Sequence, residues 1–187
     1  MPVLEGWSQI MPATEEVQII TDQVKQEAEK KIDEKYKIFT AKSYQQQVVA
    51  GMNFCIKVES GENCLGSLYV KVFQDLTAKL ELTDVVQIEL SELRDASTLP
   101  FPLDEIKQQA EDRTGKKYDI SRGINYKTLL TQIVGYTTYF IKVQVGEGKE
   151  HSHLILRVGC AATLVRKPTL TNLIENKTLS DDIEYFE

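Results

Sequence analysis

The residues best suited to nucleophilic chemistry are a histidine and a cysteine in one segment, His153 and Cys160. A cysteine thiolate activated by a neighbouring imidazole is a common nucleophile in hydrolases. The segment has the alternating pattern of a β-strand, in which successive side chains point to opposite faces of a sheet. His153 then shares a face with Arg157, whereas Cys160 shares the opposite face with Leu156. We therefore predict that the two side chains diverge and that the chain is not an enzyme.

Metal binding is a second chemistry that the sequence permits. His151 and His153 share one face of the same segment, but a metal site needs further ligands, and no other Cys or His lies near enough in the sequence to complete the shell. We predict no metal, no cofactor and solvated strand histidines. Cys55 has no histidine placed to activate its thiol, so we expect a partly exposed cysteine that is not a nucleophile.

Composition and charge exclude several kinds of partner. The 187 residues carry a formal net charge of -6, and their basic residues are interspersed with acids, which argues against a nucleic-acid surface. No stretch approaches the roughly 18 apolar residues of a membrane span, and acids interrupt the region where a secretory signal would be apolar. Three cysteines are an odd, sparse set that suits a reducing compartment. We expect a cytoplasmic protein with no nucleic-acid or membrane partner; its oligomeric state is not predicted.

The elements of the first half are predicted by a change of period. Thr14, followed by two glutamates, supplies a cap and first-turn acids for a helix. The apolar stripe of this helix has spacings of three and four and consists of Val17, Ile20, Val24, Ala28 and Ile32. After Tyr36 the apolar residues alternate over residues 53–58 and 68–72, and a further strand is expected over residues 80–88. One long helix on an antiparallel sheet follows, an α+β fold.

The sequence then repeats itself, which predicts two copies of one domain. Residues 47–49 match residues 132–134, and residues 54–58 match residues 139–143, both at an offset of 85. Residues 68–72 match residues 154–158 at an offset of 86, after which Gly159 stands in place of Phe73. A shorter helix is expected between Pro102 and Gly115, which favour a helix start and a helix end. We predict domains over residues 1–95 and 96–187, with a linker at about residues 91–100.

The sequence of residues 47–51 is Gln-Val-Val-Ala-Gly, placed between two strand-like segments. An apolar hairpin tip of this kind suggests a binding surface, and a closing glycine lets another backbone approach. In this motif the chain resembles the stefins, the type 1 cystatins. The same family is indicated by Pro12-Ala13-Thr14 before the long helix and by the acidic, aromatic-ended residues 181–186. The resemblance covers residues 6–90 and reaches the chain end, so the second copy is also a relative, in degenerate form.

The resemblance implies a fold and a function. Each copy is expected to wrap a five-stranded antiparallel sheet around its helix. The chain is expected to inhibit papain-like cysteine proteases of the cathepsin type by reversible, tight binding. In the family, an N-terminal trunk and two hairpins form a wedge that covers the catalytic cysteine. The residues that the resemblance assigns to protease binding are Gly6 and Trp7 in the trunk, Gln47, Val48, Val49, Ala50 and Gly51 in the first hairpin, and Leu76 and Thr77 in the second.

Three departures from the family pattern bear on these assignments. Glu5 stands where the trunk glycine usually lies, one place before Gly6. The family's Leu-Pro appears as Leu76-Thr77, in a loop that is shorter by a few residues. Trp7 either contacts the protease or covers its own sheet.

The second copy departs further, at Gln132, Ile133, Val134, Gly135 and Tyr136. Its glycine has moved one place forward, and Tyr136 occupies the position of the closing glycine. Inhibition is therefore expected mainly from the first copy. The alternative is a cystatin-fold interaction or scaffold protein that has lost inhibition, because a fold does not fix a function.

Overall fold

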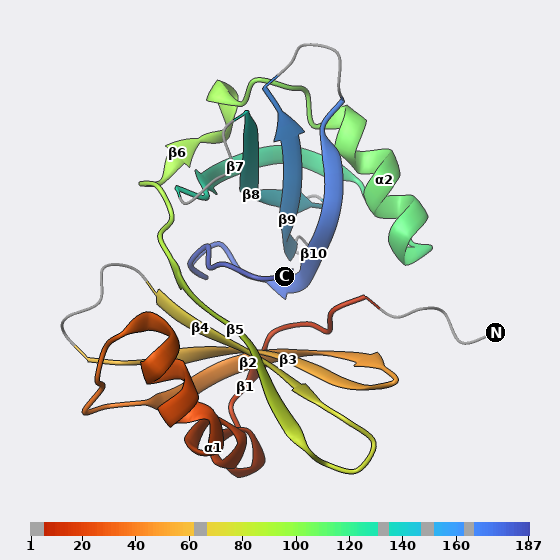
Figure 1. The fold of residues 1–187 in the computed structure, drawn as a ribbon. Helices are drawn as coiled ribbons and strands as arrows, with labels where there is room; N and C mark the ends of the chain where they lie inside the picture. Colours follow the sequence, from red (N-terminus) through yellow and green to blue (C-terminus); the bar gives the residue numbers. More distant parts are fainter. Residues whose placement is uncertain (1–5, 62–66, 131–134, 147–151, 163–166) are drawn as a thin grey trace. The chain divides into compact units, whose positions relative to one another are not determined.

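The computed structural model describes residues 6–61, 67–130, 135–146, 152–162 and 167–187 (Figure 1). The chain divides into two compact units: unit 1 consists of residues 1–89 with 186–187, and unit 2 of residues 90–185. Among the described residues, each unit contains one α-helix and one five-stranded antiparallel sheet. The predicted fold class, two tandem cystatin-like α+β domains, is confirmed.

The helix of unit 1, α1 (Glu15–Ile32), begins where the sequence predicts, directly after Thr14. The Thr14 hydroxyl accepts a hydrogen bond from the Val17 amide at 3.3 Å, which satisfies one of the amides that a helix start leaves unpaired. Asp33 closes the helix in the left-handed region, with φ 55°. The predicted apolar stripe is the buried face of the helix, from Val17 to Ala28, and it packs on the sheet.

The sheet of unit 1 has the strand order β1-β2-β3-β4-β5, so each strand pairs with its neighbours in sequence. Its strands are β1 (Met11–Pro12), β2 (Thr40–Val49), β3 (Gly51–Glu59), β4 (Ser67–Gln74) and β5 (Leu80–Ile88). The alternating residues Phe54, Ile56 and Val58 of β3 enter the core with α1. Side chains at odd positions of β3 therefore point to the opposite face.

Unit 2 repeats this architecture with a shorter helix. Its elements are β6 (Arg94–Asp95), the 3-10 helix η1 (Ala96–Thr98), α2 (Asp104–Thr114), β7 (Ile120–Thr128), β8 (Tyr136–Val145), β9 (Ser152–Ala161) and β10 (Thr169–Lys177). The strand order is β10-β9-β8-β7-β6. Gly115 ends α2 with φ 71°, as its position in the sequence predicts. Ile106 and Ala110 of the helix pack on Ile141 and Leu156 of the sheet.

Both helices are tied to the following loop by a buried glutamate. Glu29 accepts the Tyr36 amide at 2.9 Å, and Glu111 accepts the Tyr118 amide at the same distance. A lysine stands beside each carboxylate, Lys35 at 3.5 Å from Glu29 and Lys117 at 3.3 Å from Glu111. The backbone hydrogen bond, and to a lesser degree the lysine, lowers the pKa of each carboxyl group.

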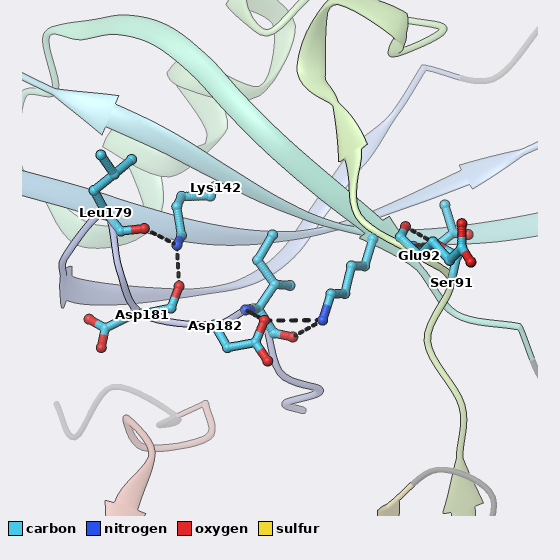
Figure 2. A network of polar contacts seen from close by, with 9 residues as sticks. Ser91, Glu92, Lys142, Leu179, Asp181 and Asp182 are labelled. Atoms are coloured by element: carbon cyan, nitrogen blue, oxygen red, sulfur yellow. Dashed lines mark hydrogen bonds and ion pairs between the residues drawn. The ribbon is translucent and has the colours of Figure 1, made fainter.

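Residues 178–185, which follow β10, pack on the sheet of unit 2 (Figure 2). The Lys142 ammonium group is buried and donates to the backbone carbonyls of Leu179, at 3.1 Å, and of Asp181. Lys127 forms an ion pair with Asp182 at 3.1 Å. Burial lowers the pKa of Lys142, an effect that the nearby carboxylate of Asp181 opposes.

Two predictions about burial are wrong. His153, expected to be solvated, is 2% exposed, because β9 has a partner strand on each side and its face opposite α2 is covered too. On that face Arg157 lies 5.7 Å from the centre of the Tyr185 ring. Cys55, expected to be partly exposed, is 3% exposed. The predicted divergence of His153 and Cys160 is confirmed: Cys160 packs with the helix-side core, as Leu154 and Leu156 do, and the unbroken register of β9 with β8 puts His153 on the opposite face.

Candidate functional site

Three segments of unit 1 meet at one end of its sheet. Neighbouring strands are antiparallel, so the start of β1, the β2–β3 turn and the β4–β5 turn must fall at the same end. The registers show this directly: Val49 of β2 pairs with Gly51 of β3, and Met52 of β3 pairs with Gln74 of β4. Figure 1 shows both hairpins and the chain before β1 at this end of unit 1. We call these three segments the edge of unit 1.

The first hairpin presents its apolar tip to solvent. Val48 is 51% exposed and Val49 43%, whereas the large apolar residues further along β3 are buried. Gly51 has φ 127°, a conformation that residues with a side chain rarely adopt. A Cβ atom at Gly51 would collide with the Gln74 carbonyl oxygen and would stand 2.9 Å from the Phe73 ring. The turn therefore requires glycine, and Phe73 of β4 fills the space beside it.

The base of the same hairpin is held by polar side chains. The side-chain amide of Asn53 donates to the side-chain oxygen of Gln47 at 3.1 Å, across the β2–β3 pair. Gln47 thus serves the geometry of the hairpin, while Val48, Val49 and Ala50 form the exposed tip.

The trunk is bound to β2 through Ser8. The Ser8 amide donates to the Gln46 carbonyl at 2.8 Å, and the Gln46 amide donates to the Ser8 hydroxyl at 3.0 Å. The side-chain amide of Gln45 donates to the Ser8 carbonyl at 2.9 Å. Gly6 is exposed and Trp7 is half-buried, so Ser8 is the point from which the trunk extends past the sheet. The predicted trunk residues 3–5 lie outside the described residues.

The second hairpin ends in a short turn between β4 and β5. Leu76 is 85% exposed, the largest exposed fraction among the described large apolar residues. Ala78 has φ 66°, in the left-handed region. Asp75 accepts hydrogen bonds from the backbone of the same turn. Leu76 and Thr77, predicted to contact a protease, thus lie at the same end of the sheet as Val48 and Val49.

The chemistry of this edge is that of a binding surface. The exposed tip side chains are aliphatic, with no nucleophile or acid–base pair among them. Across the described ranges, no group of three His, Cys, Asp or Glu residues could hold a metal ion. In the same part of the chain, no helix has the length and apolar content to cross a membrane.

Unit 2 fills the corresponding space in the opposite way. Residues 132–134 of its altered motif lie outside the described residues, while Gly135 takes the positive φ, 86°, and Tyr136 follows it. A Cβ atom at Gly159 would collide with the Tyr136 ring. Gly51 and Phe73 in unit 1 thus correspond to Tyr136 and Gly159 in unit 2, with the aromatic ring moved to the other strand. The sequence shows both replacements, but only the structure shows that they form one pair.

The trunk also has a counterpart in unit 2, which sequence reasoning missed. The Ser91 amide donates to the Thr128 carbonyl at 2.8 Å, and the Thr128 amide donates to the Ser91 hydroxyl at 2.9 Å, as Ser8 and Gln46 do in unit 1. Leu90 forms a β-bridge with Leu129. The signal was a serine at an offset of 83 residues, in a segment interpreted as linker.

Comparison with known proteins agrees with the geometry. The family model described as "Cystatin domain" matches residues 6–90. Mouse cystatin-A is 49% identical over 80 residues, which cover 42% of this chain and 80% of that protein. The chain belongs to the stefin family of cystatins. Mouse stefin-3 is 43% identical over 77 residues (41% of this chain, 73% of that protein), and bovine stefin-C 43% over 75 residues (40% and 72%). Members of this family inhibit cysteine proteases and are not enzymes.

Proposed function

We propose that this stefin is a reversible, tight-binding inhibitor of papain-like cysteine proteases of the cathepsin type, and that the edge of unit 1 blocks the active-site cleft as a wedge. The observation that carries the proposal is the convergence of three segments at one end of the sheet, with Val48 and Val49 exposed at the tip of the first hairpin and Leu76 at the tip of the second. The contact residues in this proposal are Gly6, Trp7, Gln47, Val48, Val49, Ala50, Gly51, Leu76 and Thr77. A reducing, cytoplasmic location is part of the proposal.

The edge suits inhibition for a physical reason. The first hairpin is held by strand pairing up to Val49 and Gly51, so its tip loses little conformational freedom on binding. Burial of its aliphatic side chains in a cleft contributes about 25 cal/mol per Å² of apolar surface. A preformed tip that fills a cleft without offering an extended peptide favours reversible association over cleavage.

The decisive test replaces the two exposed valines together, Val48→Asp with Val49→Asp. Two carboxylates forced into a desolvated cleft without partners cost several kcal/mol, so we expect the inhibition constant for papain to rise by roughly a hundredfold or more. The control is Ile19→Asp, which places one negative charge at a 54% exposed residue of α1, away from the edge. The control should inhibit as wild type does.

Titration of papain with the wild-type chain decides whether the protein is an inhibitor or a scaffold protein. A wild-type chain that leaves papain active at stoichiometric excess would favour the scaffold reading. A double variant as potent as wild type would move the contact away from the first hairpin.

A further inference from the structure

The turn of the second hairpin is organised by one carboxylate, Asp75. Its Oδ1 atom accepts hydrogen bonds from the Thr77 amide at 2.8 Å, the Thr77 hydroxyl at 2.6 Å and the Lys79 amide at 3.0 Å. The backbone closes the same turn, because the Asp75 amide donates to the Lys79 carbonyl and the Ala78 amide donates to the Asp75 carbonyl, each at 3.0 Å. The Asp75 side chain thus bonds to Thr77, which follows Leu76, and to Lys79, which follows Ala78.

This turn contains a backbone conformation that needs support. Ala78 has φ 66°, which is uncommon for a residue with a Cβ atom and persists only where surrounding contacts impose it. The bonds from Asp75 to the residues on each side of Ala78 are such contacts. They also lower the pKa of Asp75, the hydrogen bond from the Thr77 side chain having the largest effect.

We propose that Asp75 is a positioning residue that fixes this turn so that Leu76 is the apolar anchor of the second hairpin. The inference rests on the proposed function. The partner surface is an apolar patch on the protease beside its cleft, because Leu76 is 85% exposed and has no polar group to offer. In the family pattern a proline follows the leucine and would stiffen the loop by fixing φ. In this chain Thr77 takes that place, and three hydrogen bonds to one Asp75 oxygen stiffen the loop instead.

The test is a double-mutant cycle in the full chain with papain as the probe. We expect Leu76→Ala to weaken inhibition roughly five- to twentyfold, as truncation of an interface anchor does. Asp75→Ala should weaken it by a similar factor, because a disordered turn presents Leu76 poorly. The double variant should be no weaker than Leu76→Ala alone, because Asp75 acts through Leu76.

Two further variants separate positioning from a general structural effect. Asp75→Asn keeps an oxygen that accepts the same amide bonds and should restore inhibition to within about threefold of wild type. Asp95→Ala removes an equivalent bond to the Ser97 amide at 2.8 Å in unit 2 and should leave inhibition unchanged. Thermal unfolding of each variant confirms that the fold persists.

The outcomes distinguish the inference from the proposed function. If wild type inhibits papain but Asp75→Ala and Leu76→Ala do so equally well, the second hairpin carries no anchor and the inference is overturned. Additive losses in the double variant would also overturn it, because Asp75 would then act independently of Leu76. If wild type fails to inhibit, the proposed function fails and the inference fails with it.

Discussion

At the scale of single residues, the edge of unit 1 depends on Gly51 and its neighbours. Phe73 occupies the space that a side chain at Gly51 would need, and the Gln74 carbonyl lies against the same point. In unit 2 the ring belongs to Tyr136 and the glycine is Gly159. The Tyr136 ring of β8 therefore occupies the space that a side chain at Gly159 of β9 would need. The exchange keeps the sheet packed but leaves a ring that is 42% exposed where unit 1 has a bare backbone.

The requirement for glycine predicts the effect of Gly51→Ala. The variant should lose about 2–3 kcal/mol of unfolding free energy, because positive φ and a backbone collision add together. Gly61→Ala is the matched control: φ is 93° there, but nothing lies within 4 Å of the added Cβ atom, so strain alone should cost about 1 kcal/mol. Urea unfolding measures both. Equal losses would mean that the contact with Gln74 is relieved at no cost.

At the scale of elements, periodicity predicts α1, the long strands and α2, because the spacing of apolar residues along a long segment shows which of its faces is buried. Thr14 and Gly115 mark helix ends through local chemistry that a sequence displays. The two-residue strands β1 and β6 are too short to show a period. The segments before them are held by Ser8 and Ser91, each of which bonds to a strand that is distant in the sequence. His153 is buried because the face of the unit 2 sheet opposite α2 is also covered, and the alternation of residues along β9 does not show that a second face is covered. The candidate tip was predictable from residues 47–51, but Asp75 was not, because its role exists only once the turn is formed.

The glutamates that tie each helix to its loop predict a pH dependence of stability. Their folded pKa values lie below the ordinary value of 4.5, so the stability they contribute is complete above that value and is lost as the pH falls through the lower, folded pKa. Gln at positions 29 and 111 keeps an acceptor oxygen but does not titrate. We expect the double variant Glu29→Gln with Glu111→Gln to be less stable than wild type at pH 7, with the difference shrinking toward pH 3.

Urea midpoints of both proteins at the two pH values measure this difference. The control is Glu27→Gln, at an exposed residue of the same helix, where the substitution should have a small effect on the urea midpoint at pH 7. If the difference in urea midpoint between wild type and the double variant does not change with pH, the charged forms of Glu29 and Glu111 are not the source of the stability.

At the scale of the whole molecule, the two copies differ in how their trunks begin. In unit 1 the trunk leaves the sheet at Ser8, and Gly6 before it is exposed. In unit 2 the equivalent serine is Ser91, and only Glu89 separates Ile88, the last residue of β5, from Leu90 at the bridge to Leu129. The second trunk is therefore continuous with a strand of unit 1 and has no free end. Together with Tyr136 at the hairpin, this supports the expectation that unit 2 is a degenerate copy and that inhibition comes mainly from unit 1.

This asymmetry predicts that one full-length chain binds one protease molecule. Titration of papain of known active-site concentration should reach full inhibition at one equivalent of chain, because we expect inhibition from the edge of unit 1 and because the trunk of unit 2 is tethered to β5. Leu130→Asp, at a 52% exposed residue beside the hairpin of unit 2, should leave that endpoint and the inhibition constant unchanged, whereas Val48→Asp with Val49→Asp should abolish inhibition in the same range. An endpoint at half an equivalent of chain, or residual inhibition in the double variant that Leu130→Asp removes, would show that unit 2 also binds a protease despite its tethered trunk.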